Sequence, residues 1–335
     1  MSQNLLAQDE KYVWHPFTQH QHSLKPLEIE RAQGAYLYTK DGRKIFDAIS
    51  SWWVTLHGHC HPYLTKKIHE QLKHLDHVIF AGATHQPAVT LAKRLTAMTP
   101  GKMAKVFYSD NGSTAVEVGL KLALQYWFNQ GVTKERIIAF RHSYHGDTFG
   151  AMSVGERSTF NRPFWDKLFH VDFIDPPLRG QEKQSLEQLK KILANSNDVA
   201  CFIFEPMVQG AGGMLMQEPL ALNELIAYAR SKGVICIADE VMTGFGRTGK
   251  FFALDHIEEN SDILCVAKGL TGGVVPLSAT LCTERIYESF LSQDKTKAFF
   301  HGHSFTANPV GCAASLASMD LLTEPKTMHS IESIA

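Results

Sequence analysis

The stretch Val-Ile-Cys-Ile-Ala-Asp-Glu at residues 234–240 is a short apolar run that ends in two carboxylates. A second apolar run, Ile-Leu-Cys-Val-Ala at 263–267, is followed directly by Lys268. Short, continuously apolar runs are typical of parallel strands that are buried on both faces. Ligands of such sheets bind at the carboxyl ends of the strands, so Asp239 and Lys268 are the first candidates for the chemistry of this protein.

Runs of the same kind alternate with helix-like stretches along the rest of the chain. Further strands are expected at 105–108, 136–140 and 199–204, and helices at 64–75, 87–98, 186–193 and 220–231. Another helix is expected to follow Ser113. A short strand pair, 36–38 and 45–49, flanks an Asp-Gly turn at 41–42. The alternation predicts an α/β fold with a mostly parallel central sheet flanked by helices.

Composition places the chain among ordinary globular proteins. Its 335 residues correspond to about two domains. The 33 Lys and Arg residues nearly balance 34 Asp and Glu residues, so no basic excess indicates nucleic acid or a membrane surface as a partner. No apolar run approaches the roughly 18 residues of a membrane span, and no secretory signal is evident. None of the six cysteines forms a Cys-x-x-Cys pair, so we expect small buried side chains in a reducing compartment, the cytoplasm.

The loop Asp-Asn-Gly-Ser-Thr at 110–114 joins an expected strand to an expected helix. Gly112 allows close approach of the backbone. Ser113 offers a hydroxyl and a backbone N–H at the start of a helix, where phosphate groups bind. An ordinary helix N-cap would use the same residue types, so both interpretations stay open.

Three residues that follow expected strands are candidates for the chemistry, and each has an alternative interpretation. Asp239 needs a partner when buried, which could be a heterocyclic nitrogen cation, a salt bridge or a helix end. Desolvation would lower the pKa of Lys268 and suit it to bond covalently to an aldehyde, unless its side chain extends to the surface. Tyr144 could stack on a flat cofactor or simply pack within its loop.

Two other motifs are weaker candidates. The segment Gly-Phe-Gly-Arg-Thr-Gly at 244–249 has the glycine spacing of a nucleotide loop. It does not open a helix directly after a strand, and Phe251 stands where a P-loop needs Ser or Thr. Histidines at 57, 59 and 61 alternate along the chain and would seldom converge on one metal ion. The sequence predicts neither a nucleotide site nor a metal site here.

The combination is more specific than its parts. A phosphate seat at Gly112 and Ser113, an aromatic ring at Tyr144 and two strand-end residues suit pyridoxal phosphate. Lys268 would hold the aldehyde, and Asp239 would keep the pyridine nitrogen protonated so that the ring withdraws electrons.

The sequence resembles the class III (fold-type I) aminotransferases, which use pyridoxal phosphate. The stretches 237–249 and 267–270 carry this resemblance. The stretches Trp-His-Pro-Phe-Thr at 14–18, Ser-Ser-Trp-Trp at 50–53 and 144–153 resemble the members that act in biotin synthesis, and 204–214 agrees. The resemblance runs from about residue 14 to the last residues. It implies transamination with S-adenosylmethionine as amino donor and 8-amino-7-oxononanoate as acceptor.

The resemblance also implies roles for individual residues. Cofactor contacts are expected from Gly112, Ser113, Tyr144, Asp239, Lys268, His303 and Ser304. Substrate contacts are expected from Phe17, Trp52, Trp53, Tyr144, Lys268 and Gly302. Lys268 and Asp239 would be catalytic, with Lys268 moving the proton. The loop at 302–304 would reach the cofactor phosphate of a neighbouring subunit, which implies a homodimer with shared active sites. Phe17, His303 and Ser304 stand where the family usually has Tyr, Pro and Thr.

Three regions are expected. Residues 1–55 would contribute to a small α+β domain, 56–305 would form the large cofactor-binding domain, and 306–335 would begin the C-terminal part of the small domain. Members of the family continue further, so we expect this small domain to be incomplete and to lack an arginine that grips a substrate carboxylate. The chain would then bind cofactor poorly or lack full activity.

Other functions remain possible at this point. The chain could be another class III aminotransferase that uses lysine or a different amine as donor. It could be an inactive fragment that only binds a partner chain. A nicotinamide-binding protein would rest on 244–249 alone.

Overall fold

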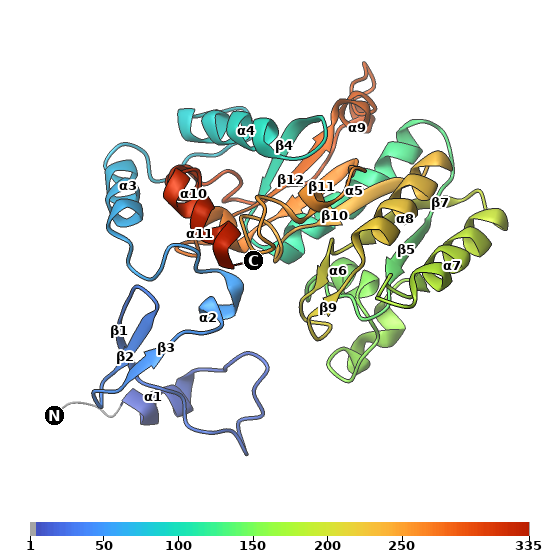
Figure 1. The fold of residues 1–335 in the computed structure, drawn as a ribbon. Coiled ribbons are helices and arrows are strands. Elements are labelled where there is room, and N and C mark those ends of the chain that lie inside the picture. Colours follow the sequence, from blue (N-terminus) through green and yellow to red (C-terminus); the bar gives the residue numbers. More distant parts are fainter. Residues whose placement is uncertain (1–4, 335) are drawn as a thin grey trace.

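The computed structural model describes residues 5–334, and its centre is a seven-stranded sheet (Figure 1). The strand order is β4-β12-β11-β10-β7-β5-β6, and β12 runs antiparallel to both of its neighbours while the other six strands are parallel. The strands are β4 (Met103–Ser109), β5 (Arg136–Phe140), β6 (Asp172–Ile174), β7 (Val199–Phe204), β10 (Ile235–Asp239), β11 (Ile263–Val266) and β12 (Ser278–Thr283). This arrangement confirms the predicted mostly parallel sheet.

Helices cover both faces of this sheet and form two separate hydrophobic cores. One core involves α5 (Gly112–Asn129), α6 (Phe149–Val154) and α9 (Glu284–Glu288). The other involves α4 (Gln86–Met98), α7 (Glu182–Ala194), α8 (Pro219–Ser231) and α10 (Pro309–Leu322). Alternate residues of a strand serve alternate cores: Ile235 and Ile237 of β10 belong to the first, and Cys236 and Ala238 to the second. Burial on both faces explains why the strand sequences are continuously apolar.

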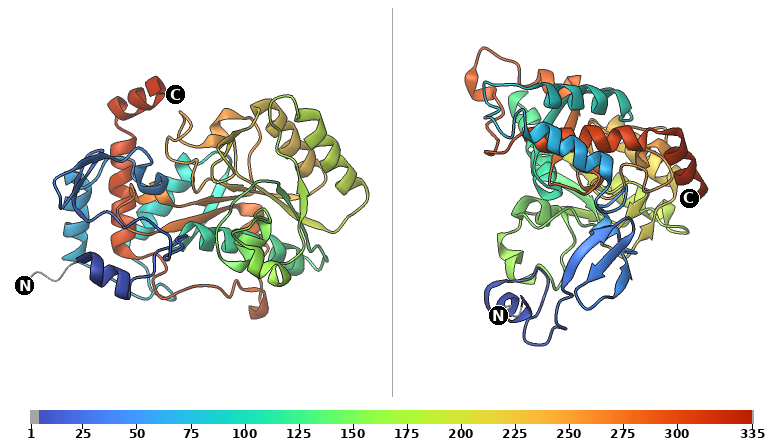
Figure 2. Two further views of the ribbon diagram at one scale, coloured as in Figure 1. Left: turned by 90° about the horizontal axis from the view of Figure 1, so that it is seen from below. Right: turned by 90° about the vertical axis from the view of Figure 1, so that its left-hand side faces the viewer.

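The N-terminal part lies outside these layers (Figures 1 and 2). It contains α1 (Leu5–Tyr12), α2 (Ser50–Trp53), α3 (Pro62–Leu72) and an antiparallel sheet of β1 (Ile29–Gln33), β2 (Tyr36–Thr39) and β3 (Lys44–Phe46). The remaining elements are η1 (Arg162–Lys167), β8 (Val208–Gln209), β9 (Leu215–Met216), η2 (Ala253–His256), η3 (Lys268–Thr271), η4 (Lys295–Lys297) and α11 (Pro325–Ile334). Helix α3 packs along α10, so a helix from the N-terminal part and one from the C-terminal part lie side by side next to the large sheet.

The apolar runs located most strands closely. The expected strands at 136–140, 199–204 and 263–266 match β5, β7 and β11. Strand β12 was not predicted because Ser278 and Thr280 interrupt its apolar pattern. Both are buried, and the Thr280 hydroxyl donates a hydrogen bond of 2.8 Å to the Ala115 carbonyl oxygen. Burial of a satisfied hydroxyl is inexpensive, so a central strand can carry polar letters.

Two smaller expectations were wrong. The strand expected at 45–49 ends at Phe46, because the Ser50 N–H bonds back to the Asp47 carbonyl and the chain turns there. Five cysteines are buried as predicted, but Cys60 is exposed.

Within residues 5–334, no helix is long and apolar enough to cross a membrane. The same part of the chain holds no group of three or more His, Cys, Asp or Glu side chains that could bind a metal ion.

Gly112 gives a test of packing at the start of α5. A Cβ atom added there would lie 2.6 Å from Cγ1 of Val241, so one of them must shift. We expect Gly112→Ala to lower the free energy of unfolding by about 1–3 kcal/mol, measured by urea denaturation. In a double-mutant cycle with Val241→Ala, the two substitutions should couple favourably. Simple additivity of the two effects would contradict this account.

Candidate active site

Two neighbouring parallel strands deliver Asp239 and Lys268 to the same edge of the sheet. Asp239 is the last residue of β10 and lies opposite Cys265 of β11. Lys268 follows β11 as the first residue of η3. The negative charge of Asp239 acts on the Lys268 amine and opposes the loss of its proton. The two strand-end residues singled out in the sequence therefore belong to one group.

Asp239 is buried and is paired with a histidine. Its Oδ2 atom lies 2.7 Å from Nδ1 of His145, and its Oδ1 accepts a hydrogen bond of 3.0 Å from the Val241 N–H. Only 4% of Asp239 is exposed. The Nε2 atom of His145 is also buried and has no hydrogen-bond partner among the described residues. A buried nitrogen without a partner is unfavourable unless a ligand supplies one.

Lys268 is held in an unusual backbone conformation with φ of +43°. Its Nζ atom lies 5.1 Å from the ring centroid of Trp53 and has no hydrogen-bond acceptor within residues 5–334. Burial lowers the pKa of Lys268, while the charges of Asp239 and Glu205 oppose this shift. A lysine with a lowered pKa supplies more uncharged amine, which is the form that attacks an aldehyde.

The start of α5 leaves Gly112 and Ser113 available. Asn111 is the N-cap, and its Oδ1 accepts a hydrogen bond of 3.1 Å from the Thr114 N–H, as part of a capping box. The Ser113 Oγ accepts a hydrogen bond of 3.1 Å from the Asp147 N–H. Its own hydroxyl hydrogen can still be donated. The cap function thus belongs to Asn111, and Ser113 is free to serve an anion at a helix N-terminus.

The loop that carries Tyr144 fits closely over this helix start. A Cβ atom at Gly146, where φ is +130°, would lie 2.0 Å from the Ser113 Oγ, so only glycine fits. Tyr144 is 40% exposed and donates its hydroxyl to Asp147 Oδ2 over 3.1 Å. Helix α5 also holds the loop through Glu117, whose Oε1 accepts a hydrogen bond of 2.8 Å from the Gly150 N–H.

Two charged residues of this region were not singled out by the strand-end argument. Glu205 follows β7 and is 5% exposed, and its two oxygens accept hydrogen bonds of 3.2 Å from the Tyr144 and Gly210 N–H groups. Burial raises its pKa to about 7. Arg247 lies in the glycine-rich segment 244–249. Its Nε is buried with no partner among the described residues, and burial lowers its pKa. A carboxylate directly after an apolar run, as at Asp239, was the signal that could have identified Glu205.

Aromatic residues of the N-terminal part lie near one another. The rings of Phe17 and Trp52 meet edge to face with centroids 5.5 Å apart, and they are 64% and 52% exposed. Trp53 approaches Lys268 as described above. The exposed ring faces make a surface that an apolar or cationic substrate group could contact.

The loop at 302–304 takes no part in this group within one chain. Among residues 5–334, no hydrogen bond or ion pair joins Gly302, His303 or Ser304 to Asp239 or Lys268. The His303 N–H instead donates 3.1 Å to the Thr306 Oγ1 on the same loop. The inferred contact of this loop with a neighbouring subunit therefore stays a prediction.

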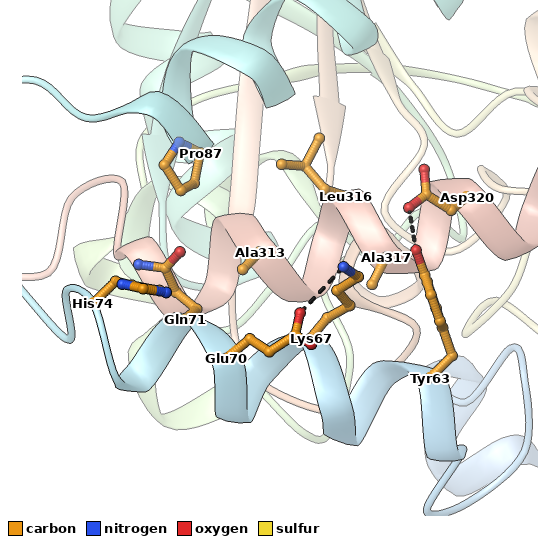
Figure 3. A pocket seen from close by; sticks show the side chains of 10 residues that line it. All are labelled: Tyr63, Lys67, Glu70, Gln71, His74, Pro87, Ala313, Leu316, Ala317 and Asp320. Atoms are coloured by element: carbon orange, nitrogen blue, oxygen red, sulfur yellow. Dashed lines mark hydrogen bonds and ion pairs between the residues drawn. The ribbon is translucent and has the colours of Figure 1, made fainter.

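A groove of about 410 Å³ lies elsewhere, between α3, α4 and α10 (Figure 3). Its charged side chains are paired with one another: the Tyr63 hydroxyl donates 2.8 Å to Asp320, and the Lys67 ammonium donates 3.2 Å to Glu70. None of the strand-end residues lines it. The groove is therefore separate from the candidate active site.

The residues fit pyridoxal phosphate on the observations above. The buried Asp239 carboxylate suits a protonated ring nitrogen. The His145 Nε2 beside it is buried without a partner among the described residues and can bond to a ligand. Lys268 offers an amine with a lowered pKa, and Ser113 offers a hydroxyl at a helix N-terminus. Gly146 has no side chain, so the loop can lie directly against Ser113 at the start of α5.

Comparisons with known proteins agree with this site. Residues 17–335 match the family model of class III aminotransferases, and the chain belongs to this family, which uses pyridoxal phosphate. A relative from Synechococcus elongatus is an adenosylmethionine-8-amino-7-oxononanoate aminotransferase, 50% identical over 325 residues, which cover 95% of this chain and 76% of the relative. The Staphylococcus aureus enzyme of the same name is 39% identical over 99% of this chain and 77% of its own length.

Solved structures agree as well. The adenosylmethionine-8-amino-7-oxononanoate aminotransferase of Methanocaldococcus jannaschii has a TM-score of 0.93 and 37% identity, covering 98% of this chain and 77% of that one. A PLP-bound amine transaminase from an uncultivated Pseudomonas species has a TM-score of 0.87 and 32% identity, covering 93% of this chain and 74% of that one. The predicted fold and cofactor class are confirmed.

Glu205 should make stability depend on pH. Its pKa is about 7 in the folded state against an ordinary 4.5. Between these values the folded chain binds the extra proton, so the contribution is complete below pH 4.5 and is lost as pH rises to 7. Relative to Glu205→Gln, the wild-type free energy of unfolding should fall by about 3 kcal/mol across this window.

Denaturant titrations at several pH values would measure this difference. Glu187→Gln, which changes an exposed glutamate on α7, is the matched control and should leave the slope unchanged. Parallel pH profiles for wild type and Glu205→Gln would disprove the role of burial at Glu205.

Proposed function

We propose that this chain transfers an amino group from S-adenosylmethionine to 8-amino-7-oxononanoate, which yields 7,8-diaminononanoate for biotin synthesis. The observation that carries the proposal is the paired placement of Asp239 and Lys268 at one sheet edge, in a chain 50% identical to an enzyme named for these two substrates. The proposed enzyme works as a homodimer in the cytoplasm, with the loop at 302–304 completing the partner's cofactor site.

Each residue has a distinct task in this proposal. Pyridoxal phosphate supplies an electron sink that stabilises negative charge at the donor carbon. Gly112 and Ser113 would bind its phosphate, and Tyr144 would contact its ring. Asp239 would face the ring nitrogen, and the 2.7 Å contact with His145 holds its carboxylate in place.

Lys268 would hold the cofactor in the resting enzyme and would then act as the base. Burial lowers its pKa, which increases the share of uncharged amine, and in that form Nζ can take a proton from the donor carbon and return it during transfer. The ring of Trp53, 5.1 Å away, excludes water from one side of this amine. The reaction is expected to be ping-pong, because both substrates use the same lysine in turn.

The exposed rings of Phe17 and Trp52 suit the donor in particular. S-adenosylmethionine carries a sulfonium cation, and cations bind favourably over aromatic faces. The alternative is another class III aminotransferase with lysine or a different amine as donor. This alternative is favoured by the similarity of the chain to solved amine and omega transaminases, which are 28–32% identical to it.

The role of Lys268 can be tested by visible absorption of the purified chain with pyridoxal phosphate. We expect a band from the lysine-linked cofactor that decreases when S-adenosylmethionine is added. Lys268→Ala should lack the band, whereas Lys190→Ala, an exposed lysine on α7, should retain it. A band that responds to lysine but not to S-adenosylmethionine would favour the alternative donor. Absence of a band in the wild type would contradict the proposed site.

The role of Trp52 can be tested by kinetics. Loss of a partly desolvated cation–π contact is worth about 1.4 kcal/mol, so Trp52→Leu should raise KM for S-adenosylmethionine about tenfold. KM for 8-amino-7-oxononanoate should change much less, since it has no sulfonium group. Trp165→Leu, which alters an exposed tryptophan of η1, is the control. Equal effects of Trp52→Leu on both substrates would reject the sulfonium contact.

A further inference from the structure

The aromatic residues at the site are carried by a strained turn. Ser50, Ser51, Trp52 and Trp53 all have positive φ, at 49°, 45°, 71° and 64°. The turn is left-handed and closed by backbone hydrogen bonds: the Trp53 N–H donates 2.8 Å to the Ile49 carbonyl, and the Val54 N–H donates 3.0 Å to the Ser50 carbonyl. L-residues other than glycine disfavour this conformation, and four in succession need external support.

Asp47 supplies that support. One carboxylate oxygen, Oδ1, accepts 2.9 Å from the Ser51 N–H. The other, Oδ2, accepts 2.7 Å from the Ser51 hydroxyl and lies 2.8 Å from the His59 Nε2. The Asp47 side chain is only 6% exposed, and its pKa lies below the ordinary value despite burial, because Ser51 and His59 bind its charged form. Hydrogen bonds to a buried carboxylate are among the stronger ones in proteins.

The N-terminal sheet fixes both partners of this pair. The Asp47 N–H donates 2.9 Å to the Ala35 carbonyl, just after β3 ends. Gly34 and His59 exchange backbone hydrogen bonds of 3.1 and 2.8 Å. A Cβ atom at Gly58 would lie 2.9 Å from the Gly34 Cα, so the two segments are in close contact. The sheet outside the large domain thus anchors the Asp47–His59 pair.

The turn at 50–53 and the residues after it pack closely against the segments around Lys268. Trp53 lies 5.1 Å from the Lys268 Nζ. A Cβ atom at Gly273 would lie 2.5 Å from the Val54 carbonyl oxygen, and the Arg247 guanidinium donates 3.3 Å to the Thr55 carbonyl. The conformation of 50–53 therefore sets where Trp52 and Trp53 lie relative to Lys268.

We propose that Asp47, held by His59, is a positioning residue for substrate specificity: it keeps the turn at 50–53 left-handed and so directs the Trp52 and Trp53 rings toward the donor substrate. Asp47 does not itself touch substrate. The inference rests on the proposed function for the identity of the donor, but the conformational role of Asp47 stands apart from it.

The test combines loss of the support with relief of the strain. Removing the charged hydrogen bonds in Asp47→Ala should raise KM for S-adenosylmethionine about tenfold with a much smaller change in kcat. The near-ultraviolet circular dichroism of the tryptophans should change as well. Adding Ser51→Gly should restore much of both, because glycine adopts positive φ without cost.

Matched variants separate positioning from folding. Asp294→Ala removes a similar carboxylate that binds the Thr296 N–H and hydroxyl, at 2.9 and 2.6 Å, and should leave KM unchanged. If Asp47→Ala alone does not fold, Ser51→Ala retains the N–H contact and should raise KM by a smaller factor. An unchanged KM and dichroism in Asp47→Ala, or no recovery with Ser51→Gly, would overturn the proposal. A wild-type chain that ignores S-adenosylmethionine would instead reject the proposed function, and the dichroism would still decide the role of Asp47.

Discussion

The 2.7 Å contact between His145 and Asp239 is the constraint around which the site is organised. A carboxylate at the end of a buried strand is costly to ionise without a partner, and His145 provides one from a different strand-end loop. The same loop brings Gly146 and Asp147 against the start of α5, and the Tyr144 hydroxyl donates a hydrogen bond to Asp147. One buried contact thus links the lysine edge of the sheet to the loop that covers the phosphate seat.

Most strands of the large sheet could be predicted from the sequence because they are surrounded by apolar side chains on both faces. Residues of β5, β7 and β11 face apolar helices on both sides, so apart from Arg136 at the start of β5 their sequences contain no charged or strongly polar letters. Strand β12 shares that environment but carries buried hydroxyls, and the Thr280 hydroxyl donates its hydrogen bond to the Ala115 carbonyl oxygen. Such pairings depend on contacts between residues far apart in the chain, and no local pattern reveals them.

The site was predictable where one residue carries the chemistry and hidden where a network does. Asp239 and Lys268 follow from their positions after apolar runs. The importance of His145 depends on the approach of two loops 94 residues apart. Arg247 lies in the glycine-rich segment that carries the family resemblance, but its own burial comes from packing against the N-terminal part, at Ser50 and Thr55. The expected domain boundaries and the roles of 302–304 stay predictions.

The left-handed turn at 50–53 also bears on how enzymes of this kind diverge. Its shape is maintained by Asp47, His59 and Gly34, which lie outside the surface that a substrate contacts. Substitutions there could reshape the range of accepted amines while every lining side chain stays the same. Comparing only pocket residues between two relatives would then miss the inherited change that separated their substrates, and ancestral histories of selectivity should include this outlying sheet.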